Sequence, residues 1–269
     1  SATYAHEIQR PEFGVGLDGL LRSVAHKLTG IVNGIDVAVW DPAHDPLIAA
    51  AFDARDLSGK QACKACLQQR MGLKADPLAP LFGIISRLVD QKGIDLILPV
   101  LPELASAGAQ AAILGNGDPW YEDRLRELSQ AFPGRISVHV GFDDALAHAI
   151  EAGSDFFIMP SRFEPCGLNQ MISMRYGTIP IVTPVGGLAD TVTALGEGER
   201  PAGLRVKTID SYALSEAVKE SMRIFGEDQE LFQRLRKNGM EQDVSWSIPA
   251  RLYLEMYRKQ KDFKESSRI

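Results

Sequence analysis

Short apolar runs alternate with turns and with segments of helical spacing from about residue 80 onward. The apolar runs predict buried strands, because nearly every position in them is hydrophobic. They lie at 81–86, 111–114, 136–140, 155–159, 179–182 and 203–206. Continuously apolar strands are typical of a parallel sheet that helices cover on both faces.

Other segments repeat an apolar residue every three or four positions and therefore predict helices. They lie at 59–71, 94–104, 120–131, 143–152, 168–176, 188–195, 210–225 and 228–240. Pro99 and Pro102 weaken the continuity of the helix at 94–104, because proline has no backbone N–H to donate. A final helix is expected from 245 to about 261, and its broad apolar stripe needs a partner surface. The stripe consists of Ile248, Leu252, Tyr253, Met256 and Tyr257.

This order of elements predicts an α/β fold with a doubly wound, parallel, Rossmann-like sheet. Crossovers between parallel strands are right-handed, so helices should lie on both faces. A ligand site is expected at the carboxyl ends of the strands. Residues 1–30 show no sustained strand pattern and are expected outside the sheet.

Composition narrows the class of protein. Of the 269 residues, 45% are hydrophobic and 24% are charged, which is enough to support a core. The net charge of −6 argues against nonspecific binding to nucleic acid or to an anionic membrane. No apolar run reaches the roughly 18 residues of a membrane span, and no signal peptide is visible. Three cysteines favour a reducing compartment, so a cytoplasmic protein is expected.

Two cations follow the first predicted strand. Arg87 and Lys92 lie where the strand ends and a helix begins. The free N–H groups and the dipole of a helix N-terminus already favour an anion at such a place. The pair therefore predicts a diphosphate site, with solvated surface charges as the alternative.

A second loop follows the fourth strand at residues 160–170. Its residues Gly167, Leu168 and Asn169 would offer backbone N–H groups to phosphate oxygens. Glu164 would accept hydrogen bonds from sugar hydroxyls and place negative charge near a developing cation. Alternatively, Glu164 pairs with Arg162 or caps the helix.

A third loop, residues 183–191, carries Gly186, Gly187 and Thr191 after the fifth strand. Paired glycines between a strand and a helix let the backbone approach a ligand closely. A plain turn fits this pattern equally well. All three loops should come to the same edge of the sheet.

Other chemistries have weaker support. Cys63 and Cys66 form a Cys-x-x-Cys pair inside a predicted helix, without a second pair or a nearby histidine pair, so no metal is expected. Gly115 and Gly117 lack the third glycine of a dinucleotide fingerprint and follow the second strand. This counts against a Rossmann dehydrogenase. No P-loop sequence is present.

Several motifs resemble the glycogen and starch synthase family, retaining glucosyltransferases that use a nucleotide-glucose donor. The most specific are SRFEPCGLNQM (161–171), MRYGTIPIV (174–182) and GGLADTV (186–192). The run ISRLVDQKG (85–93) matches the family's donor-phosphate loop. The likeness extends over nearly the whole chain through TYAHEIQRPEFGVGLDGLL (3–21), VNGIDVAVWDPAHDP (32–46) and SWSIPARLYLEMY (245–257).

The resemblance implies the C-terminal half of a two-domain GT-B glycosyltransferase. Residues 1–30 would be the tail of a missing N-terminal domain, 31–244 the nucleotide-sugar-binding domain, and 245–269 a helix that packs back toward the missing domain. The whole enzyme would move glucose from ADP-glucose to the 4-hydroxyl of an α-1,4-glucan with retention, without a metal or other cofactor. Its compartment would be the cytoplasm, or the plastid in a plant.

The resemblance also implies roles for single residues. Arg87 and Lys92 would bind the donor diphosphate, and Glu164 would sit against the glucose. Cys166 would line the sugar pocket, which Asn33 would also face. Further contacts would come from Phe142, stacked on the nucleotide base, and from Gly167, Leu168, Asn169, Gly186, Gly187 and Thr191.

Other interpretations stay open at this point. The chain is alternatively a noncatalytic nucleotide- or glucan-binding module, or a related retaining transferase that uses UDP-glucose. Binding of ADP, UDP and NAD would separate these classes. The isolated chain is expected to be inactive, because the absent domain would supply the acceptor site and part of the donor site.

Overall fold

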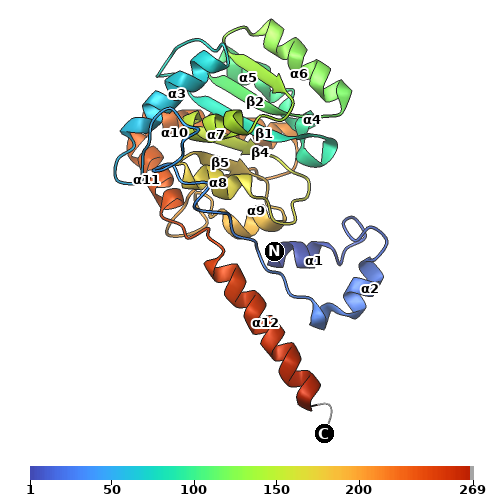
Figure 1. Cartoon of the computed structure of the whole chain (residues 1–269). Coiled ribbons are helices and arrows are strands. Elements are labelled where there is room, and N and C mark those ends of the chain that lie inside the picture. Colours follow the sequence, from blue (N-terminus) through green and yellow to red (C-terminus); the bar gives the residue numbers. More distant parts are fainter. Residues whose placement is uncertain (267–269) are drawn as a thin grey trace.

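The computed structural model describes the backbone of residues 1–266 and the side chains of residues 1–259. Within that range six strands form one parallel sheet, in the order β3-β2-β1-β4-β5-β6. Their bounds are β1 Leu81–Leu88, β2 Gln110–Gly117, β3 Ile136–Val140, β4 Phe156–Met159, β5 Ile179–Val182 and β6 Leu204–Arg205. The six predicted strands and the doubly wound, Rossmann-like sheet are therefore confirmed (Figure 1).

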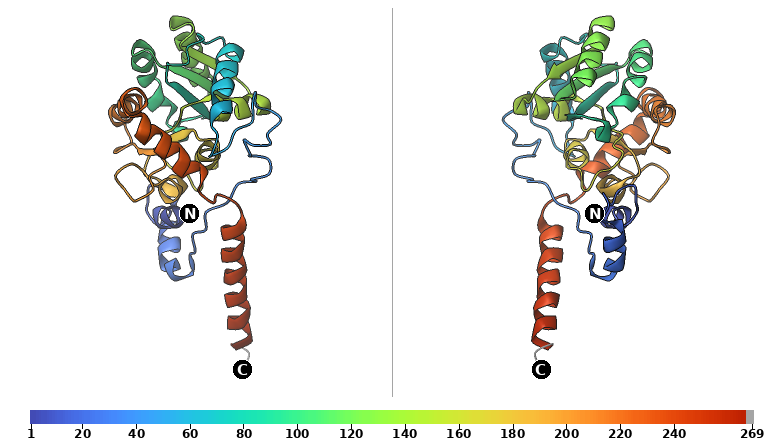
Figure 2. Two further views of the ribbon diagram at one scale, coloured as in Figure 1. Left: turned by 90° about the vertical axis from the view of Figure 1, so that its left-hand side faces the viewer. Right: turned by 90° about the vertical axis from the view of Figure 1, so that its right-hand side faces the viewer.

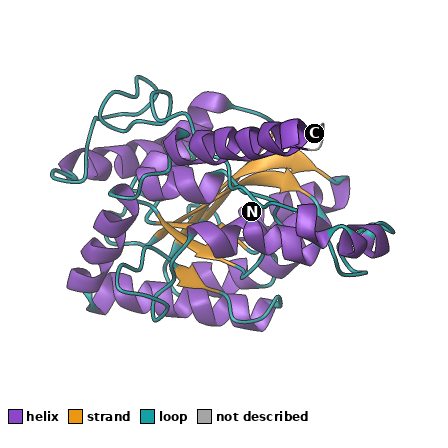
Figure 3. Ribbon diagram, turned by 90° about the horizontal axis from the view of Figure 1, so that it is seen from below, coloured by secondary structure: helices purple, strands orange, loops and turns teal. Residues whose placement is uncertain are grey.

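Helices cover both faces of the sheet, and the strands lie between them when the molecule is seen from below (Figure 3). The helices are α1 Ala2–Glu7, α2 Asp18–Ser23, α3 Ser58–Arg70, α4 Ile94–Ile97, α5 Val100–Ser106, α6 Pro119–Ala131, α7 Asp144–Gly153, α8 Asn169–Arg175, α9 Gly186–Thr191, α10 Ser211–Glu227, α11 Gln229–Met240 and α12 Ser247–Ser266. Two apolar clusters form the core. One contains side chains of α4, α5, α6, α10 and α11, and the other contains side chains of α3, α7, α8 and α9. Within the described residues, no helix has the length and apolar character needed to cross a membrane.

Two predicted helices differ from the structure. The helix expected at 94–104 is divided, because α4 ends at Ile97 and α5 begins at Val100, with Pro99 between them. Pro99 cannot donate the hydrogen bond that would continue the helix. The helix expected at 188–195 is shorter, since α9 ends at Thr191 and Ala194 instead forms a bridge with Gly203.

Lys60 of α3 joins the ends of two other helices. Its Nζ donates to the carbonyl oxygens of Ala152 (2.9 Å) and Tyr176 (2.8 Å) and to the Thr178 hydroxyl (2.8 Å). Ala152 lies in the last turn of α7, and Tyr176 directly follows α8. Because the last carbonyls of a helix lack intrahelical partners, this ammonium satisfies both helix ends at once.

The two terminal segments lie outside the sheet, as predicted for residues 1–30. α1 packs against α9, while α12 projects away from the body (Figures 1 and 2). The predicted stripe on α12 is largely uncovered, with Ile248, Leu252 and Tyr257 exposed at 44%, 43% and 61%. Tyr253 and Met256 are half-buried. The division into tail, central domain and returning helix stays a prediction.

Candidate functional site

A cavity of about 430 Å³, the carboxyl-edge pocket, lies where the central strands end. Its walls come from the ends of β1, β2 and β4 and from the segments that follow β3 and β4. The strand order reverses between β1 and β4, so the pocket lies at the topological switch point of the sheet. The predicted residues that line it are Arg87, Lys92, Phe142, Glu164, Gly167, Leu168 and Asn169.

An ion pair lies in this pocket. Lys92 Nζ contacts Glu164 Oε2, and the Ser161 hydroxyl donates to the same carboxylate oxygen over 3.2 Å. The side chains of Lys92 and Glu164 are only 19% and 8% exposed. Little water therefore screens this pair, and a positive and a negative group lie side by side in one pocket.

Arg87 is fixed through a neighbour that the sequence did not single out. Its Nη2 donates to Gln91 Oε1 over 3.0 Å, and Gln91 Nε2 donates to the carbonyl of Phe163 over 3.1 Å. Gln91 thus joins the loop after β1 to the loop after β4. The sequence places Gln91 between the candidate cations Arg87 and Lys92, but a glutamine in a turn does not by itself indicate a function.

Arg162 does not pair with Glu164. Its guanidinium binds both carboxylate oxygens of Asp95, at 2.7 and 2.6 Å. This hydrogen-bonded cation lowers the pKa of Asp95 below its ordinary value. The alternative in which Glu164 pairs with Arg162 is therefore wrong, and Arg162 instead fastens its loop to α4.

The start of α8 closes one side of the pocket. Gly167 has φ +70°, Leu168 precedes the helix, and Asn169 is its first residue. Residues in the first turn of a helix have N–H groups without an intrahelical acceptor. Asn169 Nδ2 donates to the carbonyl of Ile85 over 3.1 Å and so holds this turn against β1.

Cys166 and Asn33 lie next to each other but outside the lining of the carboxyl-edge pocket. Burial raises the pKa of the Cys166 thiol, while a hydrogen bond from the backbone of Asn33 opposes the rise. A protonated thiol is a poor nucleophile. Asn33 and Thr191 line a second cavity, beside the first turn of α12.

Gly186 and Gly187 are buried, and their close backbone approach is to the chain itself. A Cβ at Gly186 would lie 1.9 Å from the carbonyl oxygen of Glu164, and one at Gly187 would lie 1.8 Å from that of Cys166. Gly187 N donates to the Glu164 carbonyl over 2.8 Å. The glycines thus let the third loop support the loop that carries Glu164, and direct contact with a ligand stays a prediction.

Glu7 is a residue of this region that the sequence analysis missed. It lies at the end of α1, is buried, and accepts a hydrogen bond from Gly186 N over 3.0 Å. It comes from a segment that shows no sustained strand pattern, 179 positions earlier in the chain. No local pattern could have connected it with the third loop.

Phe142 stands at the mouth of the pocket and is 89% exposed. It follows Gly141, whose φ of +146° turns the chain after β3. An exposed aromatic ring at a pocket mouth offers a flat apolar face to a planar group. Its predicted role in stacking stays a prediction.

The two cysteines of the Cys-x-x-Cys pair differ in their exposure to solvent. Cys63 is buried in α3 and Cys66 is exposed on it. Among the side chains that the structure describes, no three His, Cys, Asp or Glu residues gather in a way that could hold a metal ion.

Comparison with known proteins gives consistent matches. Residues 69–242 match the family described as "Glycosyl transferases group 1". The chain is 49% identical over 261 residues to a glycogen synthase of Paracidovorax citrulli, covering 96% of this chain and 51% of that protein. It is 48% identical over 258 residues to a glycogen synthase of Anaeromyxobacter dehalogenans, covering 96% and 54%. The chain thus spans about half the length of the curated relatives it matches.

Solved structures agree with the fold. The catalytic domain of starch synthase IV from Arabidopsis thaliana, described as bound to ADP and acarbose, matches with a TM-score of 0.91 and 38% identity. That match covers 96% of this chain and 54% of the solved one. A sucrose-phosphate synthase from Thermosynechococcus elongatus matches with a TM-score of 0.60 and 24% identity, over 86% and 52%. The second likeness concerns the fold alone.

Proposed function

The chain belongs to the group 1 glycosyl transferases, and on that premise we propose that it is the donor-binding half of a glycogen or starch synthase. The whole enzyme would transfer glucose from ADP-glucose to the 4-hydroxyl of an α-1,4-glucan with retention. The relatives named glycogen synthase and the ADP-bound starch synthase support this choice of reaction and donor. The glucan acceptor and a preceding domain of the same enzyme are the proposed partners.

The observation that carries the proposal is the contact between Lys92 and Glu164 in the carboxyl-edge pocket. A nucleotide-sugar has a diphosphate, which needs cations, directly bonded to a sugar, which becomes cationic as that bond breaks. A cation beside a carboxylate matches this arrangement, because the cation can face the diphosphate while the carboxylate faces the sugar. Groups placed where charge develops stabilise a transition state more than a ground state.

The proposed division of roles follows from that match. Arg87 and Lys92 would stabilise the leaving diphosphate, as a divalent metal does in other transferases. Glu164 would stabilise positive charge on the glucosyl ring, with Ser161 holding its carboxylate. Donor binding would have to separate the Lys92–Glu164 pair, since each group then faces a different part of the substrate.

The remaining contacts are proposed from position. Phe142 would stack on the nucleotide base, and Gly167, Leu168 and Asn169 would offer N–H groups to phosphate oxygens. Cys166 and Asn33 would border the glucosyl group. Gly186, Gly187 and Thr191 would act through the loop that they support.

Calorimetric titration of the 269-residue chain with ADP, UDP and NAD tests the proposal. ADP should bind most tightly, and Arg87→Ala and Lys92→Ala should each weaken it by about 1–3 kcal/mol, the range for charged hydrogen bonds. Added salt should weaken binding as well. Arg124→Ala, which removes an exposed arginine of α6, is the matched control.

Unchanged ADP affinity in both loop variants would remove the diphosphate assignment. Tighter binding of UDP than of ADP would replace ADP-glucose by UDP-glucose as the donor. Preferential binding of NAD would reject the transferase proposal for this pocket.

A further inference from the structure

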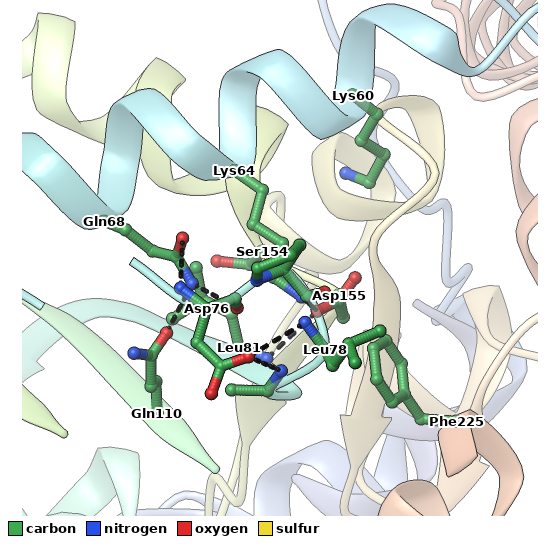
Figure 4. Close-up of polar contacts among 12 residues, drawn as sticks. Lys60, Lys64, Gln68, Asp76, Leu78, Leu81, Gln110, Ser154, Asp155 and Phe225 are labelled. Atoms are coloured by element: carbon green, nitrogen blue, oxygen red, sulfur yellow. Dashed lines mark hydrogen bonds and ion pairs between the residues drawn. The ribbon is translucent and has the colours of Figure 1, made fainter. Parts of the chain in front are cut away.

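Another polar cavity lies at the opposite edge of the sheet, where the strands begin. This amino-edge pocket has a volume of about 730 Å³ and is bordered by α3, α10 and α11 and by the segment before β1. Figure 4 shows Lys64 reaching from α3 toward Asp155, the residue that precedes β4. Nothing in the proposed transfer reaction uses this pocket.

The floor of the pocket holds a buried charge cluster. Asp155 Oδ2 accepts from Lys64 Nζ (2.7 Å) and from the backbone N–H of Leu81 (3.0 Å). Asp155 Oδ1 accepts from Arg236 Nη2 (2.9 Å). The side chains of Lys64 and Arg236 are each only 9% exposed, so both cations are held against the pocket with little access to water.

Positive charge exceeds negative charge in this cluster. Lys60, Lys64 and Arg236 line the pocket, and Asp155 is the one carboxylate among its described lining residues. Lys60 is occupied by its carbonyl and hydroxyl partners, and burial lowers its pKa well below the ordinary value, so the excess rests on Lys64 and Arg236 against the single carboxylate of Asp155. Burial of unpaired positive charge is costly, which favours a bound anion.

Among the described residues, Lys64 and Arg236 form ion pairs with no carboxylate other than Asp155. Asp56, Asp76 and Asp228 lie next to lining residues in the chain. Their oxygens accept from the backbone N–H groups of Ser58, Leu78 and Leu231, respectively. These hydrogen bonds hold the three carboxylates in local turns and in the cap of α11.

The hydrogen bonding of Arg236 is incomplete. Its buried Nε has no hydrogen-bond partner among the described residues, although the side chain is nine-tenths buried. A guanidinium presents its N–H groups as a planar fork that fits the oxygens of a phosphate. The oxygens of Asp155 already accept from three donors, one of which is Nη2 of Arg236 itself.

The walls of the amino-edge pocket carry apolar side chains and amides, which could contact the organic part of a ligand. The ring centre of Phe232 lies 4.2 Å from Cζ of the Arg236 guanidinium. The ring centre of Phe225 lies 4.9 Å from Lys64 Nζ. Leu78 adds an apolar side chain that is 82% exposed. The rim carries the exposed amides of Gln61, Gln229 and Gln233. Apolar walls with a few polar groups are typical of small-molecule sites.

We propose that the amino-edge pocket binds the phosphate group of a small phosphorylated metabolite. The phosphate would accept from Arg236 and Lys64 at the floor, and the organic part would lie between Phe225, Leu78 and the rim amides. This site is separate from the carboxyl-edge pocket, since the two lie at opposite ends of β4. It stands whether or not the transferase reaction proposed above is correct.

Titration with inorganic phosphate, followed by ³¹P NMR at constant ionic strength, tests the proposal. The protein is the full 269-residue chain carrying Arg87→Ala, which removes a cation from the carboxyl-edge pocket. We expect saturable binding in this chain. Adding Arg236→Lys keeps a charge opposite Asp155 but removes the fork, and should weaken binding about tenfold, the scale of one charged hydrogen bond.

Gln233→Glu is the second variant, because an exposed position on α11 tolerates the change. A carboxylate at the rim should repel phosphate and weaken binding about threefold, as expected for a partly screened charge. Gln130→Glu, an equal change on α6 outside the pocket, should leave the affinity unchanged. Absence of saturable binding, or binding that neither Arg236→Lys nor Gln233→Glu weakens, would overturn the proposal.

Discussion

Lys92 and Glu164 lie 72 positions apart in the chain and neutralise each other in the folded protein. Each was identified from its own loop, by a residue type that suits phosphate or sugar. Their contact depends on β1 and β4 being neighbours in the sheet. Residue type therefore indicates chemistry, whereas topology decides which charges meet.

Replacing Glu164 by Gln in the full-length enzyme should lower turnover far more than it lowers donor affinity. The neutral amide keeps the shape of the side chain but no longer stabilises positive charge on the sugar. Steady-state kinetics and donor binding measured on the same preparation check this. Turnover close to that of the wild type would return Glu164 to a structural role.

Glu151 should make the stability of the chain depend on pH. This buried carboxyl accepts from the Ser173 hydroxyl over 2.7 Å, and burial raises its pKa from 4.5 to about 8. Between these two values the folded state keeps a proton that the unfolded state releases. Its contribution to stability is therefore full below about pH 4.5 and is lost as the pH rises toward about 8.

Urea unfolding between about pH 5 and about pH 8 measures this effect, with Glu151→Gln as the reference. The wild type should lose stability relative to the Gln variant as the pH rises. A constant difference between the two proteins over this range would contradict the raised pKa.

The residues that sequence reasoning missed have no local signature. Gln91 and Ser161 hold Arg87 and Glu164 through single hydrogen bonds. Glu7 reaches Gly186 from a helix of six residues at the start of the chain. Such roles arise only when distant segments pack together, and hydrophobic spacing carries no information about them.

At the scale of elements, strands were predicted more accurately than helix ends. Each strand is a nearly continuous apolar run because it is buried on both faces, so its signal is strong. Helix limits depend on single events instead. Pro99 divides the segment at 94–104, and the bridge between Ala194 and Gly203 ends α9 early.

Gly186→Ala should disturb the support of the loop that carries Glu164. The new Cβ would lie 1.9 Å from the Glu164 carbonyl oxygen, and the φ of +42° disfavours any side chain. The loops must separate, so we expect a loss of stability of more than about 1 kcal/mol and weaker ADP binding.

Gly226→Ala is the matched control, since its Cβ would meet nothing within 4 Å in α10. This change should stabilise the chain by about 0.5–1 kcal/mol, because alanine favours a helix. Denaturant midpoints and ADP titrations of both variants make the comparison. Equal stability of the two variants would show that the loop at 183–191 is not in close contact with the loop at 160–170.

At the scale of the whole molecule, α12 leaves most of its apolar stripe uncovered. Exposed apolar surface of this kind marks an interaction site. The chain also spans about half of the relatives that it matches. Sequence indicated the stripe through its periodicity, but periodicity cannot say what covers it.

The chain alone should transfer no glucose from ADP-glucose to glycogen. In the proposed whole enzyme, the acceptor site and part of the donor site lie on a second domain, and catalysis needs closure of the cleft between the two domains. Incorporation of labelled glucose into glycogen is the direct measurement, with a full-length homologous enzyme as the positive control. Robust incorporation by this chain would show that it holds a complete active site.

The oxygen atoms around Lys60 Nζ resemble a binding site for a free cation. Three backbone carbonyls, those of Glu151, Ala152 and Tyr176, and the Thr178 hydroxyl surround the Nζ atom of Lys60. Rings of carbonyl oxygens are also how proteins hold potassium. In a Lys60→Ala chain, potassium or ammonium chloride should therefore restore more thermal stability than lithium chloride of equal ionic strength, whereas the wild type should not distinguish the three salts. The side chain would then be a tethered counterpart of a soluble ion.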